Sequence, residues 1–359
     1  MTVGRTIRRR PTAAGVMLAA ALAVLAAAFA VLAAAPNVVL AAPAGGGSAI
    51  AAAPHVGPHG RPGAEAPGTT EAGCRLYALP EDYRGPLGAF NQTVLLAHQK
   101  KRLAAINEQL YVRLRMVETR HYLLFSDADA ATTNRFRAWS EALYESLLKQ
   151  FGLSDRTRVW DGKCIVILFN RRRPFEAYSK RFDGHDARNA GAYFAAEVHG
   201  PGLPHLVHIC FPLDTNDVRR QQELFAHEGT HAFFELYKTP GRLPLWLHEG
   251  LAEYMTTVND GALRGPKWFP AVQVAATGRP LAPLFAAEPA DGLPVEQYSV
   301  AFTLVDFLLE EGRSTFKTFV DGLKDGKEQE AALREAYGFG LADLERRWRT
   351  HVRRKPTGQ

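Results

Sequence analysis

The feature that most restricts the fold of this chain is a short motif inside a well-bounded helical segment. Residues 217–238 follow the cap candidates Asp214 and Asn216 and stop before a Thr-Pro-Gly turn, which cannot continue a helix. Histidines four residues apart, as in His227-Glu228-Gly229-Thr230-His231, project from one helix face, so both imidazoles can reach one tetrahedral metal ion. The motif therefore predicts a metal-binding helix in which Glu228 stands beside the metal as a general base.

A second short helix is predicted over residues 245–254, where a third ligand is expected because catalytic zinc usually has three protein ligands and keeps the fourth position for water. Glu249 is the candidate ligand. Gly250 removes a side chain where the two helices must approach closely, and Glu253, one turn further on, can accept the outer N–H of a ligand histidine. The alternative, two solvated helix glutamates, is less favoured because the histidine pair precedes them.

The paired motifs HEGTH and WLHEGLAEYM resemble the gluzincin zinc metallopeptidases of the peptidase MA-like superfamily, and they are most similar to bacterial members classed only as a domain of unknown function. The resemblance covers roughly residues 120–349. It implies one catalytic Zn²⁺ held by His227, His231 and Glu249, with Glu228 as the base. It also implies a zincin-like α+β fold, in which a small mixed sheet lobe with an edge strand is followed by the zinc-binding helix and a C-terminal helical lobe.

The chain departs from the aminopeptidase N family within this group. That family has asparagine where this chain has His248, and its ligand spacing is one residue longer than the seventeen residues between His231 and Glu249. Its Gly-Ala-Met-Glu-Asn segment, which anchors a free amino terminus, has no counterpart here, since the nearest stretch, residues 191–195, lacks the carboxylate. An endopeptidase is therefore favoured over an aminopeptidase.

Two side chains are candidates to stabilise the oxyanion that forms during amide hydrolysis. Tyr298 begins a helix after a long loop, and it is placed by position and by the resemblance; a core-packing tyrosine is nearly as good an interpretation. His248 adjoins a ligand, although in a helix it points about 100° away from Glu249. A peptide or protein substrate is expected to lie along an edge strand of the sheet, with residues 192–198 as the candidate strand.

The charge distribution argues against nucleic acid as a partner. The net charge is +6, but four arginines lie in the first 42 residues, which contain no acidic residue, so the remaining chain carries +2. A nearly balanced chain has no electrostatic reason to seek phosphates.

The N-terminus is predicted to be a targeting segment, because that arginine cluster precedes an apolar run over residues 13–35. Residues 1–42 form either a signal peptide or an uncleaved membrane anchor, so the protein is expected to be secreted, periplasmic or tethered to the membrane. Residues 43–73, rich in Ala, Gly and Pro, are predicted to be a flexible linker. A single metallopeptidase-like domain is expected over residues 74–355, with an α/β lobe at about 118–215 and a helical lobe at about 216–355.

The remaining elements follow from hydrophobic periodicity and turn residues. A long surface loop is expected over residues 261–294. Cys164 and Cys210 lie in separate strands and could pair, but two buried free thiols are favoured. Helices are expected over residues 87–117, 131–151 and 174–182, and strands over residues 121–125, 164–169, 192–198 and 206–211.

Two rival functions remain open from the residues alone. One is a zinc-containing peptide-binding or structural module of the cell envelope that does not hydrolyse its ligand. The intact set of His227, Glu228, His231 and Glu249 argues against it. The other is an enzyme that acts on peptidoglycan peptides rather than proteins.

Overall fold

A computed structural model describes residues 83–84, 90–197, 203–289 and 292–354. All of them belong to the unit formed by residues 50–359. The predicted targeting segment, residues 1–42, and the predicted linker, residues 43–73, lie outside the described residues. Among the helices that the structure describes, none combines the length and apolar character needed to span a bilayer.

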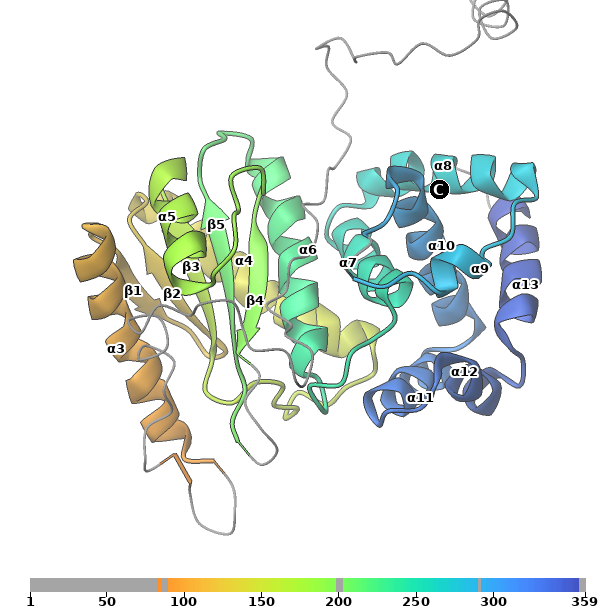
Figure 1. Ribbon diagram of the computed structural model, residues 1–359, viewed down its shortest axis with the longest axis horizontal. Coiled ribbons are helices and arrows are strands. Elements are labelled where there is room, and N and C mark those ends of the chain that lie inside the picture. Colours follow the sequence, from red (N-terminus) through yellow and green to blue (C-terminus); the bar gives the residue numbers. More distant parts are fainter. Residues whose placement is uncertain (1–82, 85–89, 198–202, 290–291, 355–359) are drawn as a thin grey trace, which may run out of the picture. The chain divides into compact units, whose positions relative to one another are not determined.

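A five-stranded mixed sheet forms the N-terminal part of the described chain (Figure 1). Its three inner strands run parallel to one another, and an antiparallel strand closes each side. The expected α+β class is therefore confirmed, and the strand expected over residues 192–198 is an edge strand. The order β1-β2-β3-β5-β4 is built from β1 (Arg115–Glu118), β2 (Tyr122–Ser126), β3 (Cys164–Phe169), β4 (Tyr193–Glu197) and β5 (Leu206–Pro212).

Helices cover both faces of this sheet, which explains why β2, β3 and β5 are buried at every position. Side chains alternate between the two faces, so Tyr122 and Leu124 join one hydrophobic cluster while Leu123 and Phe125 join the other. The first cluster lies under α4 (Ala130–Gln150) and α6 (Val218–Leu236), and the second under α3 (Gln92–Leu110) and α5 (Arg172–Phe182).

The two strand cysteines are free thiols, as favoured from the sequence. Cys210 pairs in register with Ile167, three residues along β3 from Cys164. Three residues of strand span about 10 Å, beyond the reach of a disulfide. The two thiols also belong to clusters on opposite faces of the sheet.

After α6 the described chain is helical to its end (Figure 1). The central helix, α10, is buried along most of its length and packs against α7, α8, α11 and α13. These elements are α7 (Leu245–Asn259), η2 (Gly261–Leu263), α8 (Arg264–Thr277), α9 (Ala282–Phe285), α10 (Val295–Glu311), α11 (Arg313–Lys324), α12 (Gln329–Tyr337) and α13 (Leu341–Arg354).

The expectation of a long surface loop over residues 261–294 is wrong. Most of this stretch is η2, α8 and α9, and α8 even accommodates Pro270. Its prolines and glycines suggested a loop, but Trp268, Ala271 and Ala275 share one face of α8 and are buried. Burial of that face offsets the helix penalty of the proline.

The helix expected over residues 87–117 is too long. It begins at Gln92 and ends at Leu110, because Tyr111 adopts a left-handed backbone conformation with φ of 53°. The side chain of Asn107 then holds the turn, since it accepts from the N–H of Leu114 at 2.8 Å and donates to the Leu114 carbonyl at 3.0 Å. The chain continues as β1, so the apolar residues at the end of the predicted helix belong to a strand.

Candidate metal centre

The helix that carries the histidine motif has a side-chain cap at each end. Asp217, not the expected Asp214 or Asn216, caps its N-terminus by accepting the N–H of Arg220 at 3.0 Å. At its C-terminus the buried Lys324 donates to the carbonyls of Phe234 and Glu235, at 2.7 and 3.0 Å, and to a carbonyl of the following turn. Burial lowers the pKa of this lysine to about 8.

The three predicted ligands converge on one point. His227 and His231 lie one turn apart on α6, and their Nε2 atoms are 3.1 Å apart. Glu249, in the second turn of α7, places Oε2 at 3.6 Å from the Nε2 of His227 and 3.5 Å from that of His231. All three side chains are buried, with 6 % exposure for His227 and none for the other two. Helix packing therefore gathers the three donors.

These donors fit a zinc ion. Two imidazole nitrogens and one carboxylate oxygen are a donor set typical of catalytic zinc, with metal–ligand distances of about 2.0–2.2 Å. Ligand atoms at the corners of such a tetrahedron stand roughly 3.3–3.5 Å apart. The observed separations, between 3.1 and 3.6 Å, bracket that edge length.

Glu253 lies where the sequence predicted it, next to a histidine predicted to be a ligand. Its Oε1 is 3.1 Å from Nδ1 of His227, which leaves the Nε2 lone pair of that ring for a metal. Burial raises the pKa of Glu253, but the hydrogen bond from His227 and the charge of Lys267 outweigh it, so the net pKa lies below the usual value. Glu253 is therefore ionised.

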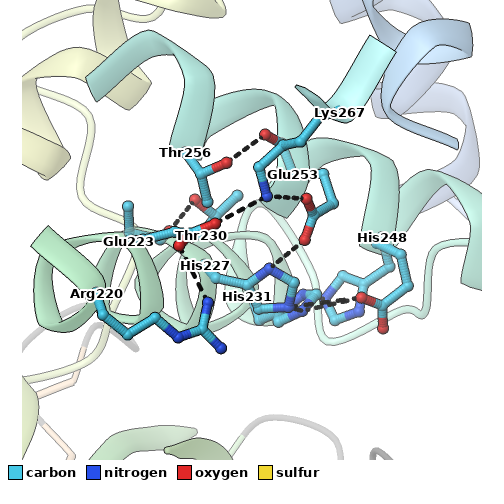
Figure 2. A network of polar contacts seen from close by, with 11 residues as sticks. Arg220, Glu223, His227, Thr230, His231, His248, Glu253, Thr256 and Lys267 are labelled. Carbon is cyan, nitrogen blue, oxygen red and sulfur yellow. Dashed lines mark hydrogen bonds and ion pairs between the residues drawn. The ribbon is translucent and has the colours of Figure 1, made fainter. Parts of the chain in front are cut away.

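Lys267 is a member of this site that the sequence analysis missed (Figure 2). Its ammonium donates to Oε2 of Glu253 and is 3.0 Å from Oε1 of Glu223, whose other oxygen accepts from Arg220 at 3.0 Å. The lysine lies in α8, inside the stretch that was expected to be a surface loop. Nothing in the sequence pairs it with Glu253, because that contact depends on how α8 packs.

Of the two predicted catalytic side chains, Glu228 adjoins a predicted ligand in the chain and Tyr298 lies within electrostatic range of the carboxylates. Glu228 is 6 % exposed and follows His227 on α6. Tyr298 lies in the first turn of α10; burial, reinforced by the charges of Glu249, Glu253 and Glu228, raises its pKa well above the usual value. The structure thus brings Tyr298 into the electrostatic range of these carboxylates, and its catalytic role stays a prediction.

His248 takes a position that the sequence did not predict. Its Nε2 lies 3.3 Å from Nδ1 of His231, so it contacts the outer nitrogen of a predicted ligand although it does not lie on the same helix face as Glu249. Phe194 of β4 contacts both rings, with centroid distances of 5.3 Å to His231 and 5.8 Å to His248. The edge strand therefore lies beside the candidate metal centre.

Gly250 is needed for close packing, but its neighbour is not the expected one. A Cβ at this position would collide with the carbonyl of Ala301 and stand 2.8 Å from Cγ2 of Val305. Both residues belong to α10, not α6. The glycine therefore fixes α7, with Glu249, against the central helix, and the expectation of an α6 contact is wrong.

Part of this chain matches a family model built from known proteins. Residues 199–354 match the family model described as the Peptidase MA superfamily. Two solved structures are similar, an M1 zinc metallopeptidase from Deinococcus radiodurans and a point mutant of it. The mutant is 15% identical, with a TM-score of 0.36, and the match covers 69% of this chain and 54% of that chain.

The unmutated enzyme is 14% identical, with a TM-score of 0.34, over 68% of this chain and 53% of that chain. This chain therefore spans about half the length of those structures. No curated protein matches the sequence.

Proposed function

With residues 199–354 matching the Peptidase MA superfamily as the premise, we propose that this chain is a zinc metallopeptidase that cleaves internal peptide bonds. The observation that carries the proposal is the buried convergence of His227, His231 and Glu249, with the buried Glu228 beside it. These residues would hold one zinc ion, which when bound supplies a Lewis acid for the scissile carbonyl and lowers the pKa of water.

Glu228 is the group that moves the proton. Its carboxylate accepts a proton from the attacking water as the water oxygen bonds to the carbonyl carbon, and then delivers it to the amide nitrogen as the C–N bond breaks. A general base must be ionised for this step. The enclosed position of Glu228 limits competing water around the carboxylate.

Tyr298 is the proposed donor to the oxyanion. Its raised pKa keeps the phenol protonated at neutral pH, which is the state that donates a hydrogen bond. His248 is the alternative donor, because its ring lies 4.1 Å from that of His231.

The substrate is proposed to be an extended peptide that adds to β4, the edge strand beside the site. Main-chain hydrogen bonds along a strand edge carry little sequence specificity. Glu197 of β4 is paired with Arg102 of α3, on the face of the sheet opposite α6 and the candidate metal centre. Glu197 therefore does not offer an anchor for a free amino terminus. This supports an endopeptidase over an aminopeptidase.

Substitution of Glu228 by glutamine tests the proposal. Glu228→Gln keeps the shape of the side chain and all three ligands, so zinc content and thermal stability should stay near those of the wild type. Hydrolysis of a broad peptide library should fall by at least about 10²-fold, the scale of a general-base contribution. Both forms should still bind peptides.

Equal cleavage by wild type and Glu228→Gln, each with full zinc, would overturn the mechanism. Peptide binding without cleavage by either form would favour the non-hydrolytic module. Cleavage of peptidoglycan peptides alone would assign the activity to the cell envelope.

A further inference from the structure

Lys267 lies at the junction of the three helices that surround the metal ligands. It extends from α8, is 9 % exposed, and contacts Glu223 of α6 and Glu253 of α7 (Figure 2). Those two glutamates belong to the same helices as the three proposed metal ligands. One ammonium group therefore joins the two ligand-bearing helices at the level of His227.

The two glutamates that contact Lys267 differ in their other partners. Glu223 has a second cation, since Arg220 donates to its other oxygen at 3.0 Å. Glu253 is 3 % exposed and is held by Lys267 on one oxygen and His227 on the other. Removing one partner of a buried ion pair leaves a charge that the interior cannot solvate. Loss of Lys267 would therefore affect Glu253 more than Glu223.

We propose, on the basis of the zinc site assigned above, that Lys267 is a positioning residue of the metal centre. Its ammonium fixes Oε2 of Glu253, which directs Oε1 to the Nδ1 proton of His227. That hydrogen bond sets the tautomer and the ring orientation, so that Nε2 of His227 faces the other two donors. Lys267 acts on the metal through two side chains and does not touch the metal or the substrate.

A purely structural role would predict a different outcome. Lys324 provides the matched case, because it is also a buried lysine, 2 % exposed, that is bound to α6. It contacts main-chain carbonyls at the C-terminal end of the helix, including those of Phe234 and Glu235, and neither Glu253 nor His227. Both lysines should stabilise the fold, but only Lys267 should change zinc affinity.

The test measures zinc affinity by chelator competition and the unfolding of the zinc-free protein for wild type, Lys267→Met and Lys324→Met. Lys267→Met should bind zinc about 10- to 100-fold more weakly, as expected when the orienting partner of a ligand is lost. Lys324→Met should keep wild-type zinc affinity even where its zinc-free form unfolds more easily. Wild-type affinity in Lys267→Met, or an equal loss in Lys324→Met, would overturn the proposal.

A double-mutant cycle tests whether Lys267 changes zinc affinity through Glu253. In a Glu253→Ala background, Lys267→Met should add little further loss of zinc affinity, because the two residues act in series. If zinc affinity in the double variant falls by the product of the factors found for the two single variants, the proposal is overturned. If Lys267→Met does not fold, Lys267→Gln, which keeps a donor but no charge, gives the same comparison with the same outcomes.

Different results would contradict the metal site and the role of Lys267. If wild-type protein binds no zinc, or if His231→Ala binds it as tightly as wild type, the metal centre itself is wrong. If wild type binds zinc and His231→Ala does not, but Lys267→Met equals wild type, only the role of Lys267 is wrong.

Discussion

Two buried clusters of this protein are built from similar side chains, and of these two only one gathers three possible metal ligands around a single point. Each contains a histidine between carboxylates and a cation that neutralises one of them. The metal-centre cluster contains His227, Glu249, Glu253 and Lys267. The sheet cluster, on the α5 side of β4 and β5, contains His208, Asp183, Glu197, Arg102 and Tyr193.

The histidines of the two clusters use their nitrogens differently. In the sheet cluster, Nε2 of His208 is 2.9 Å from Asp183 and Nδ1 is 3.8 Å from Glu197, so each ring nitrogen faces a carboxylate of its own. In the metal-centre cluster, His227 uses only Nδ1 for Glu253, while Nε2 points toward a second histidine and a third donor. The metal-centre cluster therefore has a second histidine whose Nε2 converges with that of His227, and the sheet cluster does not.

The backbone explains this difference. A helix places residues four apart on one face, so His227 and His231 aim at one point. In a strand, neighbouring side chains alternate between faces and residues on one face are about 7 Å apart, and β5 contains no second histidine beside His208. Tyr193, which donates to Asp183 at 2.6 Å, completes that cluster instead. The hydrogen bond of Tyr193 therefore ties β4 to Asp183, which follows α5. This cluster offers no donors that converge on one point.

The largest expected effect separates the clusters by metal content. His231→Ala and Glu249→Ala should each lose most of the zinc, because each removes one of the three proposed ligands. His208→Gln, in the sheet cluster, should retain it. The measurement is the zinc content of the purified variants. Near-stoichiometric zinc in both His231→Ala and Glu249→Ala would show that these residues are not needed to bind the metal, and the contrast between the two clusters would be lost.

A smaller effect is expected from the carboxylates that orient the two histidines. Glu253→Ala should weaken zinc binding by roughly 10- to 100-fold without abolishing it, because His227 loses the acceptor of its Nδ1 proton. Asp183→Asn, the equivalent change beside His208, should leave zinc affinity at the wild-type value. A competition titration measures both, and unchanged affinity in Glu253→Ala would make that residue a structural glutamate only.

The smallest effect concerns the acid stability of the sheet cluster. Burial raises the pKa of Asp183, but the charge and hydrogen bond of His208 and the hydrogen bond from Tyr193 outweigh it, so the pKa falls below its usual 3.8. A carboxylate with a lowered pKa in the folded state stabilises the fold above pH 3.8, and this contribution is lost as pH falls through the folded pKa.

Denaturant unfolding of zinc-free wild type and Asp183→Asn at a series of pH values measures this contribution. The difference in free energy of unfolding should narrow as the pH falls below about 4. A difference that stays constant or widens would show that Asp183 gains no ionic stabilisation from its neighbours.

Local sequence rules explain most of the elements that were predicted correctly. The strand at residues 164–169 and the helix of the histidine motif are close to their predicted bounds, because apolar periodicity and turn residues are properties of short stretches. The second motif helix starts at the predicted residue but continues to Asn259, five residues beyond its predicted end. The same rules failed over residues 87–117 and 261–294. There a side-chain contact of Asn107, and the packing of the Trp268 face, decided where elements begin and end.

The sequence alone determined the donor set of the candidate site and its order along the chain. Residues four apart lie on the same face of a helix, so the pairing of His227 with His231 could be predicted without a structure. Only the tertiary structure decided which groups support these ligands. The contact of Glu253 with Lys267 joins residues 14 apart in the chain, on two different helices, and exists because α7 and α8 both pack against α10. Packing of that kind is set by the fit of whole helix surfaces, which no local spacing encodes.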